Sequence, residues 1–419
     1  MRQPRALIDA TMGFGLRTGG DDAAAIQNAV DRAAAQGGAA VYLGSGPLTF
    51  RSGISWGTPG IQLIGDGPGS TVATIAYSPA TDVIAIGAPG ANAGFSAVRK
   101  MEFVMAPGFT QSNGALLHVT NSHDVTLTEI ASWDSDPAHC FRAHYYVNGG
   151  PDQYITWLRD LEINPLNPAA GDAAIVIGGS GLGGSDGGGI PQDTWIENVE
   201  MGGGNVANCG IALYNSAGTQ IIGCDIISSV MSVATFPGPG QQAVNTFCDQ
   251  LLCDGSRDRG CLLGTGGGVV ASFHCVNSWF SSTGINWDAL SGEVSGLVIN
   301  GGSGPTIDTL SFTNCHFLTN WYDGVEILGN ARNIDFIGCQ FSGNSFGSPG
   351  GYNGLLAYGG AGIEGLSIIG GRANGGLWQG WPTVQGSGIN IGGGISPLTI
   401  EGVQTIGNLT GGIVSDSPY

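Results

Sequence analysis

Positive charge is scarce in this sequence of 419 residues, which contains only 13 Lys and Arg residues, a single one of them lysine (Lys100). With 32 Asp and Glu residues, the formal net charge is −19. A nucleic-acid-binding protein needs a basic patch to neutralise phosphates, and anionic membrane surfaces attract basic segments. We therefore expect no nucleic acid and no anionic membrane surface among the partners.

Long apolar runs and cysteine spacings of metal sites are missing as well. No stretch approaches the 18 or more apolar residues of a membrane span, and the residues after Met1 show no signal-peptide pattern. We expect no membrane insertion and no signal peptide. The nine cysteines are odd in number and lack the paired spacing of zinc ligands, which favours folding in a reducing cytoplasm without disulfides, metal or other cofactors.

Glycine, in contrast, is abundant, with 76 residues, and hydrophobic residues make up 42% of the chain. A chain of this length and hydrophobicity can bury a large core, which excludes a disordered protein. The glycines show no three-residue period, which excludes collagen. The high glycine content must therefore be required by some other architecture.

Internal repeats supply that architecture. A short alternating pattern (apolar, any, Asn or Gly, small or apolar, any, apolar) recurs at intervals of 24 to 38 residues. One interval of 54 residues equals two of 27 if a further copy lies near Leu251. Alternation predicts short strands, and periods of this size are typical of a solenoid. The clearest copies are residues 310–317, 334–341, 366–373 and 398–405.

The Asn/Gly position of the repeat predicts a corner between two strands. Seven of its ten occupants are Asn or Gly, the residues that enter the left-handed backbone region most easily. The following position, which includes Cys224, Cys315, Cys339, Val199 and Val403, should then point into the core. The ten predicted corner residues are Lys100, Glu129, Asp160, Asn198, Gly223, Asn277, Asn314, Gly338, Gly370 and Gly402.

Residues 18–43 carry a family resemblance. They contain Thr18-Gly-Gly-Asp-Asp, an amphipathic stretch with Ile26 and Val30, a Gly-Gly break and an apolar strand. This order resembles the start of pectate-lyase-like right-handed parallel β-helix proteins. The resemblance implies an all-β, single-stranded right-handed parallel β-helix of about 11–12 rungs with an N-terminal capping helix. We expect an N-terminal segment over residues 1–40 and one continuous β-helix over residues 41–419.

The family includes polysaccharide lyases, glycoside hydrolases, epimerases and bacteriophage tailspikes, so the fold alone does not define function. Because no export signal is visible, we favour a tailspike or receptor-binding protein of the virion tail, made in the host cytoplasm. The resemblance then implies a homotrimer that recognises a bacterial surface polysaccharide and attaches to other phage tail proteins such as an adapter. The alternative is a free, extracellular carbohydrate-active enzyme.

The motifs of the polygalacturonase branch are absent: there is no Asn-Thr-Asp, Gly-His-Gly or Arg-Ile-Lys. The sequence therefore leaves open whether the protein cleaves its glycan or only binds it. If it is catalytic, we expect a glycoside hydrolase (a polysaccharide depolymerase). Elimination by a lyase mechanism is the weaker alternative, because a basic residue beside an acidic sugar is hard to place among so few.

An acidic row gives the candidate catalytic residues. The outward position just past the corner is occupied by Glu162, Glu200 and Asp225 in three successive copies. Neighbouring coils lie about 4.8 Å apart, so these carboxylates should lie almost in contact. Such pairs supply the acid and the base or nucleophile of glycosidases. The competing interpretation is a set of solvated carboxylates on a solenoid face.

A second candidate is the segment 133–146, which departs from the repeat pattern. It concentrates carboxylates, imidazoles, an arginine and aromatic rings, the side chains that bind sugar hydroxyls and stack on sugar rings. The alternative is a structural loop whose aromatic residues pack over a coil. The candidate binding residues are Trp133, Asp134, Asp136, His139, Arg142, His144, Tyr145 and Tyr146.

Overall fold

The chain folds into two compact units, which we describe separately in this computed structural model. Unit 1 comprises the described residues up to Ile211 together with Asn215–Gln220, and unit 2 comprises Ala212–Tyr214 and the described residues from Ile221 onward. The predicted division at residue 40 stays a prediction. The structure describes residues 6–88, 90–150, 153–169, 172–179, 189–202, 204, 207–264, 266–284, 294–302, 307–358, 362–375 and 385–418.

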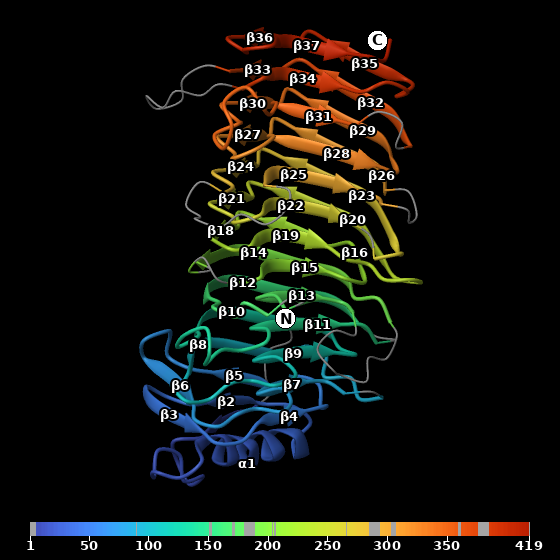
Figure 1. Ribbon diagram of the computed structural model, residues 1–419. Coiled ribbons are helices and arrows are strands. Elements are labelled where there is room, and N and C mark those ends of the chain that lie inside the picture. The colour runs from blue at the N-terminus through green and yellow to red at the C-terminus, as the bar shows by residue number, and fades with distance from the viewer. Residues whose placement is uncertain are drawn as a thin grey trace. The chain divides into compact units, whose positions relative to one another are not determined.

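Unit 1 is built from parallel strands in two sheets, and each coil passes from one sheet to the other (Figure 1). β15 (Cys209–Leu213) and β17 (Gln220–Ile222) have residues in both units. The second sheet contains β4 (Ile54–Trp56), β7 (Ile84–Ile86), β9 (Leu117–Thr120), β11 (Tyr145–Asn148) and β13 (Ile175–Ile177). The first contains β1 (Leu7–Asp9), β2 (Ala40–Tyr42), β3 (Gly46–Phe50), β5 (Gln62–Ile64), β6 (Thr71–Ile75), β8 (Ala97–Met105), β10 (His123–Trp133), β12 (Tyr154–Asn164), β14 (Gln192–Gly202) and β16 (Ser216–Ala217).

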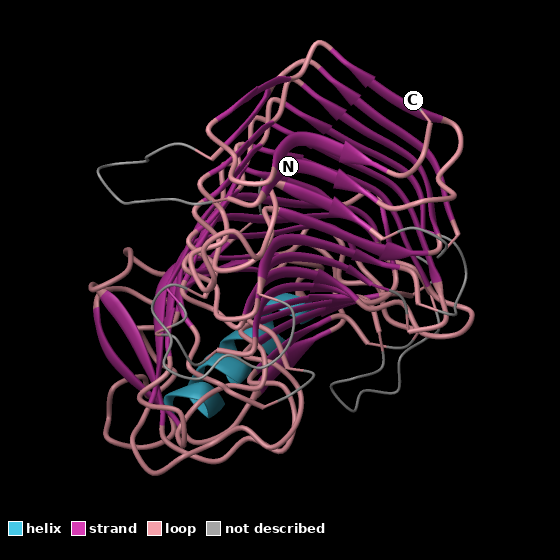
Figure 2. Cartoon of the chain, turned by 45° about the horizontal axis from the view of Figure 1, so that its top comes forward, coloured by secondary structure: helices cyan, strands magenta, loops and turns pink. Residues whose placement is uncertain are grey.

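Helix α1 (Asp22–Ala35) packs against β2, β3 and β4 in unit 1. The Asp21 side chain accepts a hydrogen bond from Ala23 N at 3.1 Å, which satisfies a backbone donor of the first turn. Ile26 and Val30, four residues apart, are completely buried on the face that meets the strands. Figure 2 shows α1 in cyan, the only α-helix among the described residues. Within the part of the chain that the structure describes, no helix is long and apolar enough to cross a membrane.

Unit 2 consists of three rows of parallel strands, so that each coil contributes one strand to each row. One row contains β18 (Asp225–Ile227), β21 (Leu252–Asp254), β24 (Trp279–Ser281), β27 (His316–Leu318), β30 (Gln340–Ser342), β33 (Arg372–Asn374) and β36 (Gln404–Ile406). The next contains β20 (Gln242–Asp249), β23 (Val269–Val276), β26 (Ile307–Thr313), β29 (Ala331–Ile337), β32 (Ile363–Ile369) and β35 (Leu398–Glu401). The third contains β19 (Met231–Thr235), β22 (Arg259–Gly264), β25 (Ser295–Asn300), β28 (Val325–Gly329), β31 (Leu355–Ala357), β34 (Ser387–Ile391) and β37 (Gly411–Ser415).

The predicted corner residues do have left-handed backbone conformations. All ten have a positive φ, between 49° and 67°. Gln250, at φ 53°, precedes the buried Leu251 and supplies the additional copy that the interval of 54 residues required. Of the five residues predicted to follow the corner inward, Val199, Cys224, Cys315 and Cys339 are buried. Val403 is only half-buried, in the turn just before β36, the last strand of its row.

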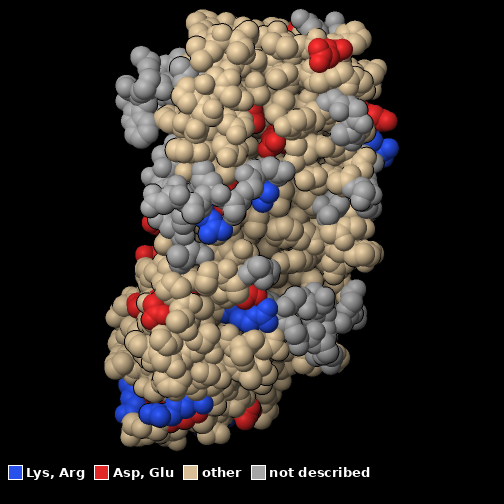
Figure 3. Space-filling model, in the orientation of Figure 1, with Lys and Arg blue, Asp and Glu red and all other residues tan. Residues whose placement is uncertain are grey.

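Identical residues stack along the core of unit 2. Phe280, Phe317 and Phe341 lie on successive coils, with ring centroids 5.1 and 5.4 Å apart and rings nearly parallel at 8°. Parallel stacks of this kind contribute stability beyond their buried area, about 0.5–1.5 kcal/mol per pair. All nine cysteines are buried and free of disulfides. The surface shown in Figure 3 carries few charged side chains, in keeping with a chain of which 11% is charged.

Candidate functional site

The outer face of unit 1 is formed by long strands whose side chains alternate between core and solvent. Because β10, β12 and β14 are parallel and in register, equal positions in successive coils lie side by side, about 4.8 Å apart. Three such rows lie on either side of the corner: Thr126–Trp157–Trp195, Thr128–Arg159–Glu197 and Ala131–Glu162–Glu200. Thr126 and Ala131, the β10 members of their rows, are buried.

Two indole rings form the centre of this face. The rings of Trp157 and Trp195 stack with centroids 4.8 Å apart and an interplanar angle of 19°. Both side chains are half-buried, so part of each indole remains accessible to solvent. The stack fixes both rings at little further entropic cost, which makes a rigid, amphipathic surface.

Arg159 joins these rings to a carboxylate. Its guanidinium lies over the Trp157 ring, 4.8 Å from the centroid, and forms an ion pair with Glu197 at 2.6 Å across the strands. The cation–π contact contributes about 0.5–1 kcal/mol at an exposed position, and a surface ion pair a similar amount or less. Arg159 remains 42% exposed, so its other donors are available to a ligand.

A second aromatic group lies at the start of the same strands. The His123 ring stacks on Tyr154 with centroids 5.0 Å apart and 5° between the planes, and Phe95 packs edge-on against His123 at 4.9 Å. His123 Nδ1 lies 2.9 Å from a carboxylate oxygen of Asp124. Tyr154 is 41% exposed, so part of this aromatic side chain is accessible to solvent.

The backbone is strained directly after Tyr154. Ile155 has a φ of 56°, in the left-handed region that β-branched residues rarely enter. Such strain amounts to about 1–3 kcal/mol and is concentrated at functional sites. Asp124 on β10 and Asp193 on β14, at the equivalent positions in register, have the same conformation (φ 53°), so Ile155 occupies a corner that successive coils share.

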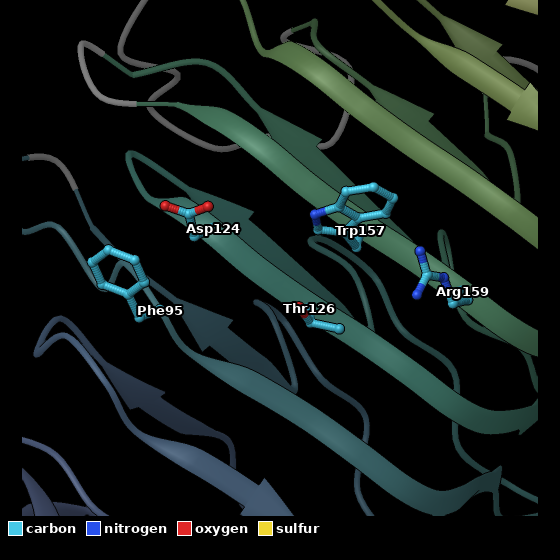
Figure 4. A pocket seen from close by; sticks show the side chains of 5 residues that line it. All are labelled: Phe95, Asp124, Thr126, Trp157 and Arg159. Atoms are coloured by element: carbon cyan, nitrogen blue, oxygen red, sulfur yellow. The ribbon is translucent and has the colours of Figure 1, made fainter. Parts of the chain in front are cut away.

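Between the two aromatic groups the surface is hollowed. The hollow has a volume of about 190 Å³ and combines aromatic rings, a carboxylate, a guanidinium and a hydroxyl from three successive coils (Figure 4). Rings stack on the apolar face of a small molecule while the polar groups bind its hydroxyls. The lining residues are Phe95, Asp124, Thr126, Trp157 and Arg159.

Two of the three predicted catalytic carboxylates are brought together. Glu162 on β12 lies directly opposite Glu200 on β14, and both residues are exposed. Ala131 occupies the same row on β10, so the pair has no third carboxylate on that side. Asp225 lies on β18 in unit 2, half-buried and opposite Leu252. The catalytic role predicted for Asp225 stays a prediction.

Part of the predicted binding segment is a buried polar network. The Asp134 carboxylate accepts hydrogen bonds from the backbone N–H groups of Phe141 and Leu166, both at 2.7 Å. The carboxylate also lies 3.4 Å from Nε2 of the His144 ring. The other ring nitrogen of His144, Nδ1, lies 2.9 Å from Ser132 Oγ. Asp134 is 5% and His144 1% exposed. These contacts hold a loop against the coil, and we leave both residues out of the ligand-binding set.

Three further residues of the segment also pack into unit 1. Tyr145 and Tyr146 lie on β11 and are buried; the Tyr146 hydroxyl donates a hydrogen bond to the Gly179 carbonyl. Burial raises the pKa of Tyr145. Arg142 forms a bidentate ion pair with Asp172, with the shortest N–O distance 2.6 Å. The two tyrosines cannot stack on a sugar from solvent, because the coil covers their rings.

The remaining three predicted residues are accessible. Trp133 ends β10 and is half-buried, opposite Asn164 of β12. His139 Nδ1 lies 2.8 Å from Asp136 in the following turn, and this hydrogen bond lowers the pKa of the Asp136 carboxyl. Both side chains are partly exposed, so they remain candidates at the edge of the face.

The sequence analysis did not identify Trp157 and Trp195, although a signal for them exists. Each stands three residues before a corner residue, Asp160 or Asn198, in neighbouring copies of the repeat. Aligning the copies column by column would have placed both indoles in one outward row. Residues 133–146 are clustered along the sequence instead, and a solenoid disperses such neighbours over different faces.

Metal ligands are not grouped in the described part of either unit. Among the described residues, no three or more His, Cys, Asp or Glu side chains are placed to hold a metal ion. Burial raises the pKa of the Cys140 and Cys209 thiols to about 12, which keeps them protonated and unreactive.

Comparisons with solved structures find the same fold in phage tailspikes and in a bacterial adhesin. A double mutant of the tailspike protein of E. coli bacteriophage HK620 matches with a TM-score of 0.65 at 12% identity, over 98% of this chain and 76% of the tailspike. Tailspike protein 3 of bacteriophage CBA120 matches with a TM-score of 0.62 at 16% identity, over 98% of this chain and 59% of the tailspike. The surface protein and adhesin PfbA of Streptococcus pneumoniae matches with a TM-score of 0.51 at 13% identity, over 98% of this chain and 100% of PfbA.

These likenesses show the fold, a parallel β-helix, and confirm that expectation from the sequence. No protein-family model matches the sequence, and no curated protein matches it either.

Proposed function

We propose that the protein binds a bacterial surface polysaccharide through the outer face of unit 1, as a bacteriophage tailspike or receptor-binding protein. The observation that carries the proposal is the rigid Trp157–Trp195 stack with Arg159 above it, beside an open hollow. A sugar ring offers an apolar C–H face to an indole and hydroxyls to Arg159 and Asp124. The tailspike-like fold supports the same conclusion.

Depolymerisation is the second part of the proposal, and it rests on the paired carboxylates. Glu162 and Glu200 occupy adjacent strands, the arrangement in which one carboxyl protonates the glycosidic oxygen and the other acts as base or nucleophile. Trp157 and Glu162 are five residues apart on β12, at most about 17 Å. An oligosaccharide lying along the strands therefore spans both the stacking surface and the carboxylates.

The finer features of the resemblance belong to this proposal. We propose a right-handed coil closed at its N-terminal end by α1, a homotrimer, and attachment to a virion tail through other tail proteins. Packing of α1 on β2–β4 supports the capping role. Light scattering of the native protein tests the assembly: a trimer gives about three times 42.5 kDa. A monomer would instead favour the alternative, a free extracellular carbohydrate-active enzyme.

Binding is tested on an array of purified capsular and O-antigen polysaccharides. We expect the unaltered protein to bind a subset, and the double variant Trp157→Ala/Trp195→Ala to bind that subset about 100-fold more weakly because the stacking surface is gone. Phe247→Ala is the matched control, since Phe247 is an exposed aromatic residue (46%) that stacks on His274 in unit 2. Unchanged affinity in the double variant would exclude unit 1's aromatic face as the binding surface.

Cleavage is tested separately on the polysaccharides that bind. Glu162→Gln and Glu200→Gln should each reduce the release of reducing ends by about 1,000-fold, because an amide neither protonates a leaving group nor acts as a base. Glu102→Gln is the control: Glu102 belongs to the same outward row but is separated from the pair by Ala131. Full activity in both Gln variants would refute the catalytic assignment and leave a binding protein.

A further inference from the structure

Unit 2 has a hollow of its own, formed by three successive strands of one row. β21, β24 and β27 are in register, which aligns Leu252 with Trp279 and Asp254 with Ser281 and Leu318. The hollow has a volume of about 390 Å³. Its walls are one indole ring, two leucine side chains, three hydroxyls and one carboxylate, contributed by Leu252, Asp254, Trp279, Ser281, Ser282, Leu318 and Thr319.

The indole is held rigidly by the neighbouring coil. The His316 ring stacks on Trp279 with centroids 5.0 Å apart and 15° between the planes. His316 does not line the hollow, so it supports the indole from the next strand. A ligand in the hollow meets an aromatic ring whose conformation is already fixed, which lowers the entropic cost of binding.

The polar groups of the hollow are also positioned in advance. Ser281 Oγ donates a hydrogen bond of 2.6 Å to Asp254 Oδ1. Ser282 and Thr319, on successive coils, have left-handed backbone conformations (φ 56° and 54°), where serine and threonine are strained. The Ser282 hydroxyl makes no hydrogen bond within the part of the chain that the structure describes.

We propose that this hollow is a second carbohydrate-binding site, specific for a neutral pyranose unit. An indole and two leucines match the C–H face of the ring, while the Asp254 carboxylate and the Ser282 hydroxyl match hydroxyls at its edge. Among the described residues that line the hollow none is basic, and Asp254 disfavours uronic acids and phosphorylated sugars. The site extends the proposed function to unit 2, but it requires no residue of the unit 1 face.

The test uses three neutral trisaccharides as probes: maltotriose, cellotriose and triacetylchitotriose. Dissociation constants are measured by saturation-transfer difference NMR on the full chain carrying Trp157→Ala/Trp195→Ala, which removes the unit 1 surface. We expect saturable binding of at least one probe, weakened about tenfold or more when Trp279→Ala is added. Trp279→Phe should restore most of the affinity, and Phe247→Ala should leave it unchanged. Asp254→Asn, which still accepts the Ser281 hydrogen bond, should weaken binding a few-fold.

Two outcomes would overturn the second site. One is that adding Trp279→Ala changes the affinity for the probe by less than twofold, while the variant unfolds at the same temperature as its parent. The other is the absence of saturable binding of every probe to the Trp157→Ala/Trp195→Ala protein. Neither outcome affects the proposed function, because that is judged from polysaccharide binding by the unaltered protein and its loss in the double variant.

Discussion

The two units form their corners with different residues, although the backbone at those corners is the same. In unit 1 the four predicted left-handed positions carry Lys100, Glu129, Asp160 and Asn198. In unit 2 the six predicted positions carry only Asn or Gly, and the additional corner carries Gln250. A charged residue with a β-carbon costs about 1–2 kcal/mol in this conformation relative to Gly. Three of the four corners in unit 1 therefore carry charged side chains, whereas unit 2, apart from Gln250, has the residues that adopt this conformation most easily.

The side chains at the unit 1 corners form a polar border to the aromatic face. Lys100 Nζ lies 3.9 Å from Glu129 on the next coil, and Asn198 donates a hydrogen bond of 3.1 Å to Asp160. Asp160 follows Arg159 directly along β12. If the proposed function holds, the strained corners of unit 1 surround the stacking surface with hydrogen-bonding groups that a binding face requires.

Two buried carboxylates, one in each unit, have different kinds of partner. In unit 1, Asp172 is paired with the guanidinium of Arg142. In unit 2, Asp323 is 2% exposed and accepts hydrogen bonds only from neutral groups, the backbone N–H and the side-chain amide of Asn353, at 2.6 and 3.0 Å. Burial raises the pKa of Asp323 to about 7.

The largest effect that we predict follows from this carboxyl. Because the folded-state pKa lies above the unfolded value, Asp323 stabilises the protein fully below about pH 4, and this contribution disappears as the pH rises through about 7. Asp323→Asn keeps the acceptor but never ionises. At about pH 8 the variant should exceed the unaltered protein in unfolding free energy by on the order of 4 kcal/mol, with little difference at about pH 4. Thermal unfolding of both proteins between about pH 4 and pH 8 measures this difference in unfolding free energy. A difference that does not change with pH would contradict the prediction.

The next prediction compares the loss of an exposed arginine in unit 1 with the loss of one in unit 2. Arg159→Ala removes the contact with the Trp157 ring and leaves Glu197 without its ion-pair partner. Polysaccharide binding should weaken about tenfold. Arg332→Ala is the matched control, since Arg332 forms an exposed ion pair with Asp308 across two strands of unit 2, at 2.8 Å. Equal losses in both variants would show that net charge, and not the face of unit 1, controls binding.

The sequence predicts the fold in detail because a solenoid repeats its local rules. All ten corner residues could be located from the Asn/Gly position, including Lys100 and Glu129, which have neither residue type. The same spacing placed Glu162 opposite Glu200. Register between coils is encoded in the interval between copies, and this information is local.

The candidate site is harder to predict because burial depends on the coils above and below. Asp134, His144 and Tyr145 have the chemistry of a sugar-binding wall, yet neighbouring coils and loops cover them. Nothing in residues 133–146 distinguishes an inward from an outward carboxylate. Trp157 and Trp195 meet only across the coils, so no window along the sequence shows them as a pair.

A smaller effect is expected at the glycine corners of unit 2. At Gly370, φ is 65° and a β-carbon would contact nothing within 4 Å, so only the backbone conformation opposes a side chain. Gly370→Ala should lower the unfolding free energy by about 1 kcal/mol. Gly20→Ala is the control: a β-carbon at Gly20 in unit 1 would also contact nothing within 4 Å, and Gly20 does not have a positive φ. This substitution should change stability little. Denaturant titration measures both, and equal stability of the two variants would argue against strain at the corner.

The smallest effect is the reverse substitution in unit 1, and it tests the comparison most directly. Glu129→Gly relieves about 1–2 kcal/mol of left-handed strain, but glycine loses about 0.5–1 kcal/mol more conformational entropy on folding. We therefore expect a net stabilisation of about 0.5–1 kcal/mol together with weaker polysaccharide binding, because the border of the face is broken. Glu129→Gln separates the two causes, since it keeps the strain and removes only the charge facing Lys100. A glycine variant that is less stable than the unaltered protein would show that the Glu129 side chain stabilises its corner, and the difference between the units would then not reflect strain retained for binding.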